Sequence, residues 1–252
     1  MEEQLMAERN LIIKWRVGSH LYGTNTLDSD EDTVGICVPD IDYVIGTKRF
    51  EQHEHRTNSA GTGKRNTSQD SDLVIYSLPK FLHLLTGNNP NIVELLFATE
   101  NCVLFKNEYG QAILDHAKLF VSKKAYHTFS GYAHQQRHKL STKQPEGSRK
   151  ELVDQYGYDT KFGYHLIRLY YESIELLADG RITFPLSCRK QLLNIKRGET
   201  SLAEGLAEAD RLKALTDTVW ANSPLQQSAD VVAINRLQKK LLMEFWKATG
   251  QI

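Results

Sequence analysis

The chain has only three cysteines in 252 residues, Cys37, Cys102 and Cys188, and no two of them form a Cys-x-x-Cys pair. This spacing argues against a zinc ribbon or a dithiol redox motif and predicts reduced, partly buried thiols. No apolar run approaches the ~18 residues that span a bilayer. The acidic segment Met1–Gln4 opens no signal-peptide core. We therefore expect a cytoplasmic protein without a membrane partner.

The chain also lacks net charge, because 31 Lys and Arg residues balance 31 Asp and Glu residues. A zero balance argues against a strong nonspecific nucleic-acid binder. The charges are nevertheless unevenly spread: residues 24–56 hold eight acids and three bases, and residues 119–150 hold seven bases and one acid. A site for metal plus polyphosphate needs an acidic cluster facing a basic segment. The alternative is two solvated surfaces of opposite sign.

The hydrophobic share of 40% and the charged share of 25% are typical of a soluble globular protein. Hydrophobic patterns predict an α/β half over residues 1–120 and a helical half over 121–252. Strands are expected at 11–17, 32–38, 48–56 and 72–77, with a helix from Pro79 to Gly87 and a mobile loop between Thr57 and Ser71. Helices are expected at 122–141, 160–179, 201–220 and 228–248, with a break between Ser141 and Lys150.

The strongest chemical signal is Gly18-Ser19, followed after ten residues by Asp30-Glu31-Asp32. Residues two apart on a strand share a face, so an extended segment places Asp30 and Asp32 together and Glu31 opposite. Adjacent carboxylates repel unless a cation neutralises them, and Mg²⁺ prefers hard oxygen ligands. Gly18 permits close approach of the backbone to a phosphate, and Ser19 opens a short segment whose N–H groups are available to that phosphate. Alone, each part is more often a turn or a solvated loop; together they indicate a metal site.

A third carboxylate is expected on a neighbouring strand, where a second ion would activate the attacking oxygen. Asp72 opens the apolar run Leu73–Tyr76 and is the preferred residue. Asp70 is the competitor, two residues earlier and within the polar loop.

These residues resemble the signature of the DNA polymerase-beta-like nucleotidyltransferase superfamily. More closely, Gly18–Thr24 is similar to a bacterial and phage group of predicted nucleotidyltransferases, some of them associated with RNA ligases and RNA repair. Further similar stretches are 72–82, 87–91, 94–96, 159–161, 165–169 and 195–198, so the likeness covers about residues 12–198. The resemblance implies an α+β fold with a mixed sheet and a helical C-terminal half. It also implies two Mg²⁺ or Mn²⁺ ions held by Asp30, Asp32 and Asp72, and nucleotide phosphate at Gly18 and Ser19. The sequence departs from the superfamily at Glu31 and Thr33, which flank Asp32 where apolar residues are usual.

Lys161, His165, Arg168 and Glu172 follow a helical spacing and form one stripe. The family likeness favours Lys161 and Arg168 as ligands of triphosphate or acceptor, with His165 nearby. The alternative is a solvated helix edge on which Arg168 pairs with Glu172. Tyr22 is a candidate for stacking on a base, although a packed aromatic is more common. Glu94 is expected to be a structural, hydrogen-bonding acid.

The leading hypothesis is metal-dependent transfer of a nucleoside monophosphate from NTP to an acceptor hydroxyl, with release of pyrophosphate. The acceptor is an RNA end, a small molecule or a protein side chain. Two alternatives are a non-catalytic nucleotide-binding protein on the same fold and a metal-dependent phosphohydrolase. The preferred NTP, the oligomeric state and the role of residues 199–252 are left open by the sequence.

Overall fold

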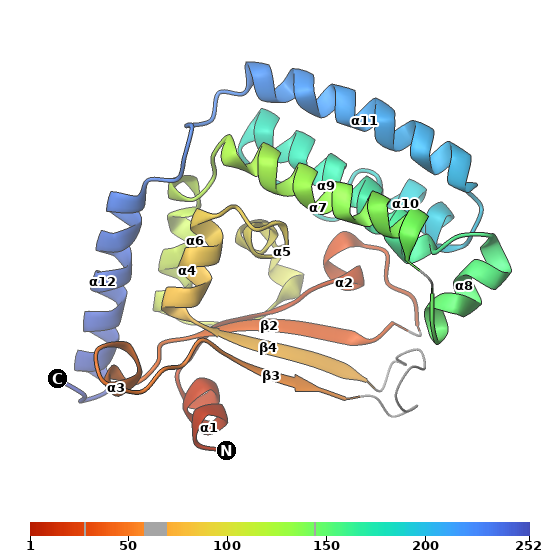
Figure 1. The fold of residues 1–252 in the computed structure, drawn as a ribbon. Coiled ribbons are helices and arrows are strands. Elements are labelled where there is room, and N and C mark those ends of the chain that lie inside the picture. The colour runs from red at the N-terminus through yellow and green to blue at the C-terminus, as the bar shows by residue number, and fades with distance from the viewer. Residues whose placement is uncertain (28, 58–69, 144) are drawn as a thin grey trace.

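The computed structural model describes residues 1–27, 29–57, 70–143 and 145–252. Within these ranges the fold is α+β, as predicted, with a five-stranded mixed sheet and a helical second half (Figure 1). The strands are β1 (Leu11–Arg16), β2 (Glu31–Cys37), β3 (Gln52–Arg56), β4 (Ser71–Ser77) and β5 (Val103–Lys106). The helices of the first half are α1 (Glu2–Arg9), α2 (Ser19–Tyr22), α3 (Ile41–Val44), α4 (Leu78–Thr86), α5 (Pro90–Val93) and α6 (Glu108–Asp115), with 3-10 turns η1 (Glu94–Phe97), η2 (Glu100–Cys102) and η3 (Ala117–Leu119). Those of the second half are α7 (Lys124–Thr142), α8 (Ser148–Tyr156), α9 (Thr160–Asp179), α10 (Arg189–Lys196), α11 (Leu202–Asn222) and α12 (Val231–Ala248).

The strand order is β3-β4-β2-β1-β5, and only the central pair β2 and β4 is parallel among these described strands. Strands β1, β2 and β4 confirm the predicted strands at 11–17, 32–38 and 72–77, and their ends differ from the prediction by about one residue or less. Strand β3 is shorter than the predicted 48–56. Strand β5 was not predicted. Because β2 and β4 run in the same direction, their first residues meet at one edge of the sheet. That edge is where the sequence places the candidate acids.

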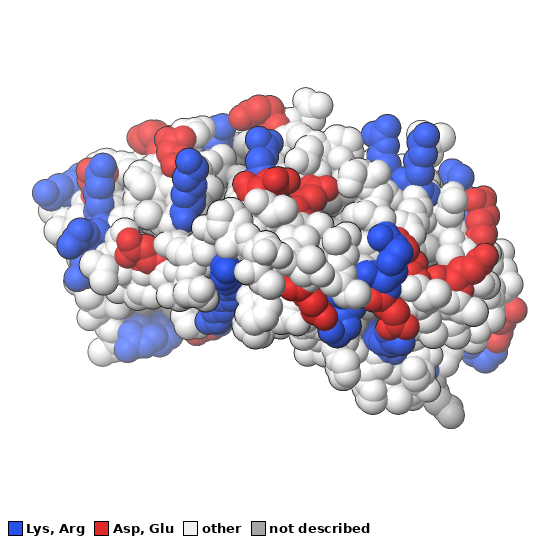
Figure 2. Space-filling view, turned by 90° about the horizontal axis from the view of Figure 1, so that it is seen from above, with Lys and Arg blue, Asp and Glu red and all other residues white. Residues whose placement is uncertain are grey.

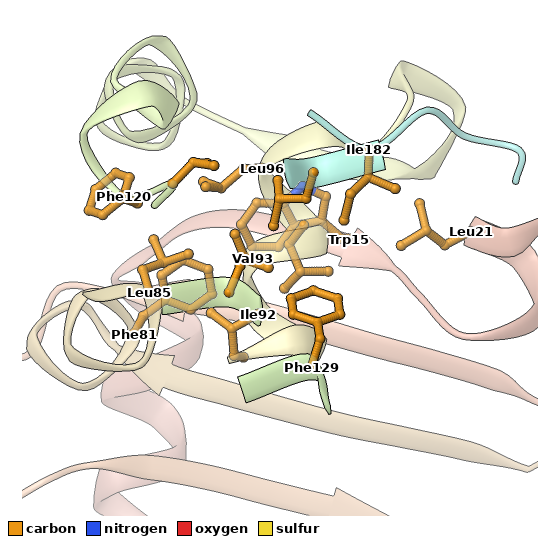
Figure 3. Close-up of a cluster of buried hydrophobic side chains, with 14 of the residues drawn as sticks. Trp15, Leu21, Phe81, Leu85, Ile92, Val93, Leu96, Phe120, Phe129 and Ile182 are labelled. Carbon is orange, nitrogen blue, oxygen red and sulfur yellow. The ribbon is translucent and has the colours of Figure 1, made fainter. Parts of the chain in front are cut away.

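The main hydrophobic core lies between the sheet and the helices above it (Figure 3). Trp15 of β1 stacks on Phe81 of α4 with the ring centroids 5.9 Å apart. Phe129 of α7 and Ile182, which follows α9, enter the same cluster from the second half of the chain. One continuous core therefore joins both halves of the chain.

The last helix, α12, does not stay with the helical half but returns to the α/β half, beside α4 and α6 (Figure 1). The indole Nε1 of Trp246 donates to the carbonyl of Pro39 at 2.9 Å, and the backbone N–H of Ile41 donates to Gln251 Oε1 at 2.9 Å. Residues 199–252 thus contribute α11 to the helical layer and α12 to the covering of the first half. The division at residue 120 stays a prediction.

Two smaller predictions can be compared with the described residues. The three cysteines are free thiols and are buried, as expected. No helix in the described ranges is both long enough and apolar enough to cross a membrane. The predicted mobile loop lies, apart from its ends, outside the described residues.

Candidate active site

Three candidate acids gather at the sheet edge where β2 and β4 begin. Asp30 directly precedes β2, Asp32 is the second residue of that strand, and Asp72 is the register partner of Asp32 on β4. Register partners on parallel strands point to the same face. Asp70 lies before β4 and is 1% exposed, and its carbonyl accepts from the Glu31 N–H at 3.2 Å. The register therefore favours Asp72 over Asp70 as the partner of Asp32.

Glu31 points away from this group, as the alternation along the strand predicts. Its carboxylate forms an ion pair with Arg16 at 2.8 Å, on the neighbouring strand β1. The Glu31 that departs from the superfamily pattern is thus a surface partner of Arg16, and the register of β2 is the expected one.

The turn at Gly18 brings the backbone against the Asp32 carboxylate. A Cβ at Gly18 would lie 2.8 Å from Asp32 Oδ2, and the backbone there has φ +64° and ψ −135°. Glycine adopts this conformation readily, whereas L side chains rarely do. The β1–α2 connection and the β2 acids are therefore packed as one unit, held further by the Val17 N–H, which donates to the Asp32 carbonyl at 2.9 Å.

Electrostatics shows that the three acids interact. The pKa of Asp32 is raised to about 6, first by burial and then by the charges of Asp30 and Asp72, while Lys161 opposes the rise. Carboxylates in this state gain from any cation placed between them.

A cleft of about 370 Å³ opens in front of Asp30 and Asp32. One wall comes from the first half of the chain and the other from α8, α9 and α10. The lining residues are Gly18, Ser19, Tyr22, Ser29, Asp30, Asp32, Ser148, Arg149, Thr160, Lys161, Tyr164, His165 and Lys196. An acidic wall thus faces a basic one, although of the seven bases in residues 119–150 only Arg149 lines the cleft.

The basic wall contains Lys161, Arg149 and Lys196. Lys196 Nζ donates to the Thr24 carbonyl at 3.3 Å. His165 lies among these cations, and burial together with the charges of Arg168, Arg149 and Lys161 lowers its pKa to about 3. His165 is therefore neutral at physiological pH and offers a hydrogen bond without adding a charge.

Tyr22 lines the cleft but is 5% exposed, and its hydroxyl is directed into the protein. The hydroxyl donates to the Glu94 carboxylate at 2.9 Å and accepts from Arg168 Nη1 at 2.6 Å. This packed position matches the alternative reading of Tyr22 better than stacking on a base.

Arg168 does not lie in the cleft. It is 3% exposed and pairs with Glu94 at 2.8 Å and with Glu172 at 3.0 Å, beneath Tyr22. Arg168 matches neither prediction made for the stripe. It is not a ligand in the cleft, and its pairing with Glu172 occurs in the interior instead of on a solvated helix edge. Because Arg168 forms ion pairs with two buried carboxylates, its role is structural: it links α9 to η1. Glu94 is the buried hydrogen-bonding acid that was expected.

Sequence reasoning missed Arg149, Ser148, Thr160 and Lys196 as parts of the cleft. Arg149 belongs to the basic segment 119–150, and Lys196 belongs to a stretch already noted for its family likeness. Neither the basic segment nor the family-like stretch indicates which residues Arg149 and Lys196 face. Both residues reach the cleft only because α8 and α10 pack on α9.

A comparison with protein families decides which group the chain belongs to. Residues 2–219 match the model of the RNA repair pathway DNA polymerase beta family, RlaP. The chain is a member of the RlaP family. The resemblance to polymerase-beta-like nucleotidyltransferases is thereby confirmed, and the match extends beyond the stretch recognised from motifs.

Two curated proteins are similar to this RlaP-family chain. An uncharacterized 38.9 kDa protein of Enterobacteria phage T4 is 31% identical over 142 residues, covering 55% of this chain and 40% of the phage protein. An uncharacterized protein of Methanocaldococcus jannaschii is 28% identical over 163 residues, covering 65% of this chain and 58% of the archaeal protein. The chain thus spans less than two thirds of either relative. A solved nucleotidyltransferase-like protein from Exiguobacterium sibiricum aligns over 98% of this chain and 75% of its own, with 8% identity and a TM-score of 0.31.

Asp30, Asp32 and Asp72 of this RlaP-family protein supply only part of the ligand set of a metal ion. In the ranges that the structure describes, no group of three or more His, Cys, Asp or Glu side chains is placed to hold an ion by itself. Mg²⁺, however, commonly binds one or two carboxylates and completes its shell with water and substrate phosphate. Asp30 and Asp32 fit that donor set, with Asp72 beside them.

The raised pKa of Asp32 predicts a pH-dependent stability difference in the metal-free RlaP-family protein. The folded state holds the Asp32 proton more tightly than the unfolded chain, so ionisation destabilises the fold as pH rises through about 6. Asp32→Asn should therefore raise the melting temperature at pH 7, and the gain should shrink as pH falls towards about 4. Thermal unfolding in EDTA across this range measures it, with Glu31→Gln as the control. A gain that does not change with pH would contradict the acid cluster.

Gly18→Ala should lower turnover on the order of 100-fold, because the added Cβ displaces the Asp32 carboxylate by a distance that catalysis does not tolerate. It should also cost about 1–3 kcal/mol of stability through its positive φ. Gly250→Ala is the matched control, since Gly250 has φ +69° and open space around its Cβ position. Steady-state kinetics beside thermal unfolding compares them. Equal activity in the two variants would remove Gly18 from the site.

Proposed function

We propose that this protein is a metal-dependent nucleotidyltransferase that moves a nucleoside monophosphate from NTP to an acceptor hydroxyl, with an RNA end as acceptor. The observation that carries the proposal is the cleft itself, where Asp30 and Asp32 face Arg149, Lys161 and Lys196. Acids alone would suit a metal, and cations alone would suit an anion. Both together in one cleft suit a metal-bound polyphosphate.

Asp30, Asp32 and Asp72 would hold two Mg²⁺ or Mn²⁺ ions. When bound, such ions neutralise charge that develops on the phosphoryl oxygens and lower the pKa of the attacking hydroxyl. Because the described acids form no complete cage, the ion and the nucleotide are expected to bind together.

The chain's own residues would bind and orient the substrate. Gly18 and Ser19 would lie against the β and γ phosphates, and Lys161 and Lys196 would offset their charge from the opposite wall. Asp72 would accept the proton of the acceptor hydroxyl as its oxygen bonds to the α phosphorus. The bond from that phosphorus to the β-phosphate bridging oxygen breaks, and pyrophosphate leaves.

His165 would stay neutral throughout, because the neighbouring cations and burial oppose its protonation. A neutral ring can donate a hydrogen bond to a phosphate or sugar oxygen while leaving the charge balance to the lysines. This position and the family membership together support a role for the first turns of α9 in substrate binding.

The decisive experiment is incubation of the protein with α-labelled NTP, Mg²⁺ and candidate acceptors, RNA ends first, followed by mass spectrometry of the acceptor. Gain of a nucleotide with equimolar pyrophosphate supports the proposal. Release of phosphate without transfer would indicate the phosphohydrolase, and binding without turnover would indicate the non-catalytic protein. Asp32→Asn is the control for contaminating activity.

A further inference from the structure

A second group of cations lies beside the cleft, around one aromatic ring. The ring of Phe162, at the start of α9, has Arg149 at 4.5 Å, Lys139 at 5.6 Å and Lys143 at 5.7 Å from its centroid. We name Lys139, Lys143 and Arg149 the Phe162 cluster. Lys139 lies in the last turn of α7, Lys143 is the C-cap residue that follows this helix, and Arg149 lies in the first turn of α8.

Asp159 offsets one of the three charges of this cluster. Asp159 accepts two bonds from Arg149, at 2.8 and 2.9 Å, and also caps α9 through the N–H groups of Lys161 and Phe162. Among the described residues, neither Lys139 nor Lys143 forms an ion pair within 4 Å. Lys139 lies in the last turn of α7 and Lys143 is the C-cap residue of that helix, so two like charges lie over the same ring at one helix end.

The helix dipoles explain only part of this arrangement. Lys139 near the end of α7 is favourably placed, because a helix C-terminus attracts cations. Arg149 and Lys161, however, lie in the first turns of α8 and α9, where the helix end is itself positive. Asp159 offsets Arg149 and the α9 N-terminus, whereas Lys139, Lys143 and Lys161 add further positive charge in the same region, and the lowered pKa of His165 reflects this excess. An arrangement that is unfavourable in the isolated protein suits an anionic ligand.

The geometry points to the phosphate backbone of an acceptor RNA strand as this ligand. Arg149 lines the cleft and also covers Phe162, whereas Lys139 and Lys143 do not line the cleft. The cluster therefore begins at the rim of the cleft and extends away from it. A strand whose terminal hydroxyl enters the cleft would place its next phosphates against the two lysines. Phe162 is 6% exposed, so it supports the cations and does not stack on a base.

This assignment reconciles the cluster with a chain of zero net charge. On the face shown in Figure 2, Lys and Arg residues are interspersed with Asp and Glu residues, which does not favour backbone binding there. A local cluster of cations can bind a few phosphates even though the whole chain has no net positive charge. That the bound RNA strand is the acceptor rests on the proposed function. That the Phe162 cluster binds an RNA strand does not.

The test measures RNA binding and nucleotide binding separately. A short single-stranded RNA with a free 3′-hydroxyl is titrated by fluorescence anisotropy over a salt series, against wild type and the double variant Lys139→Gln/Lys143→Gln. Loss of two phosphate contacts should reduce the slope of log affinity against log salt by about 1.4, because each contact on a single strand contributes about 0.7. RNA affinity should fall at least about tenfold. The Kd for Mg-NTP, measured without RNA, should not change.

The control is Lys239→Gln/Lys247→Gln, which removes the same charge from exposed positions of α12. Equal effects of the two double variants would overturn the proposal, because the loss would then reflect total charge. A fall in NTP affinity instead of RNA affinity would also overturn it and assign the cluster to the triphosphate. If wild type binds RNA through the cluster yet transfers no nucleotide, the binding track stands and the proposed reaction fails. Melting temperatures confirm that both variants are folded.

Discussion

Asp32→Asn is expected to lower metal-dependent turnover by at least about 100-fold, equivalent to roughly 2.7 kcal/mol in the activation barrier. The change removes one negative charge from the group formed with Asp30 and Asp72 and leaves the side-chain volume almost unaltered. Asp32 is the register partner of Asp72 and lies against Gly18, and the charges of both Asp30 and Asp72 act on it. Initial rates at saturating Mg²⁺ and NTP measure the effect.

The chain offers a close control one residue away. Glu31→Gln also removes a carboxylate from the start of β2, but this side chain faces Arg16 on the other side of the strand. Its turnover should stay within a few-fold of wild type, and its stability should change by less than about 1 kcal/mol, as for exposed ion pairs generally. Equal losses in the two variants would mean that strand β2 is merely disturbed. Retained activity in Asp32→Asn would move the metal site elsewhere.

The contrast between these neighbours shows why the acidic wall was predictable from sequence. Alternation along a strand is a local property, so Asp30 and Asp32 on one face and Glu31 on the other follow from spacing alone. Asp72 was preferred because it opens an apolar run that was expected to form a neighbouring strand. The parallel pairing of β4 with β2 places that strand beside Asp32. Long amphipathic helices were predictable for the same reason, because their pattern extends over many residues.

The parts that escaped prediction depend on contacts between distant segments. Strand β5 has four residues, with Leu104 and Phe105 42% and 45% exposed, and its pairing with β1 leaves no periodic pattern. Arg149 and Lys196 enter the cleft through helix packing, which charge patterns do not specify. Arg168 was expected in the cleft because it shares a helical stripe with Lys161 and the family likeness favoured both as ligands. The two residues are about two helical turns apart, and at Arg168 the helix α9 has already entered the core.

Arg168→Met is accordingly expected to lower the free energy of unfolding by about 3–5 kcal/mol, since it leaves a buried charge without its partner. Burial and the neighbouring carboxylate of Glu94 raise the pKa of Glu172 well above its ordinary value, while the charge of Arg168 opposes this rise. Urea unfolding at pH 7 measures the loss. Arg211→Met is the control, because Arg211 forms an exposed pair with Glu208 on α11 and should cost less than about 1 kcal/mol.

A second substitution separates this structural role from contact with a substrate phosphate. Adding Glu94→Gln to Arg168→Met removes the unpaired charge and should restore part of the lost stability, whereas an Arg that only binds phosphate would show no such coupling. The Kd for Mg-NTP, measured on the folded fraction of Arg168→Met, should rise only modestly, through the loss of the bond that holds Tyr22. An unaltered stability together with a large fall in NTP affinity would place Arg168 in the cleft after all. The expected pattern assigns it instead to the junction on which the two walls of the cleft are aligned, because its partners Tyr22 and Glu94 belong to one half of the chain and Glu172 to the other.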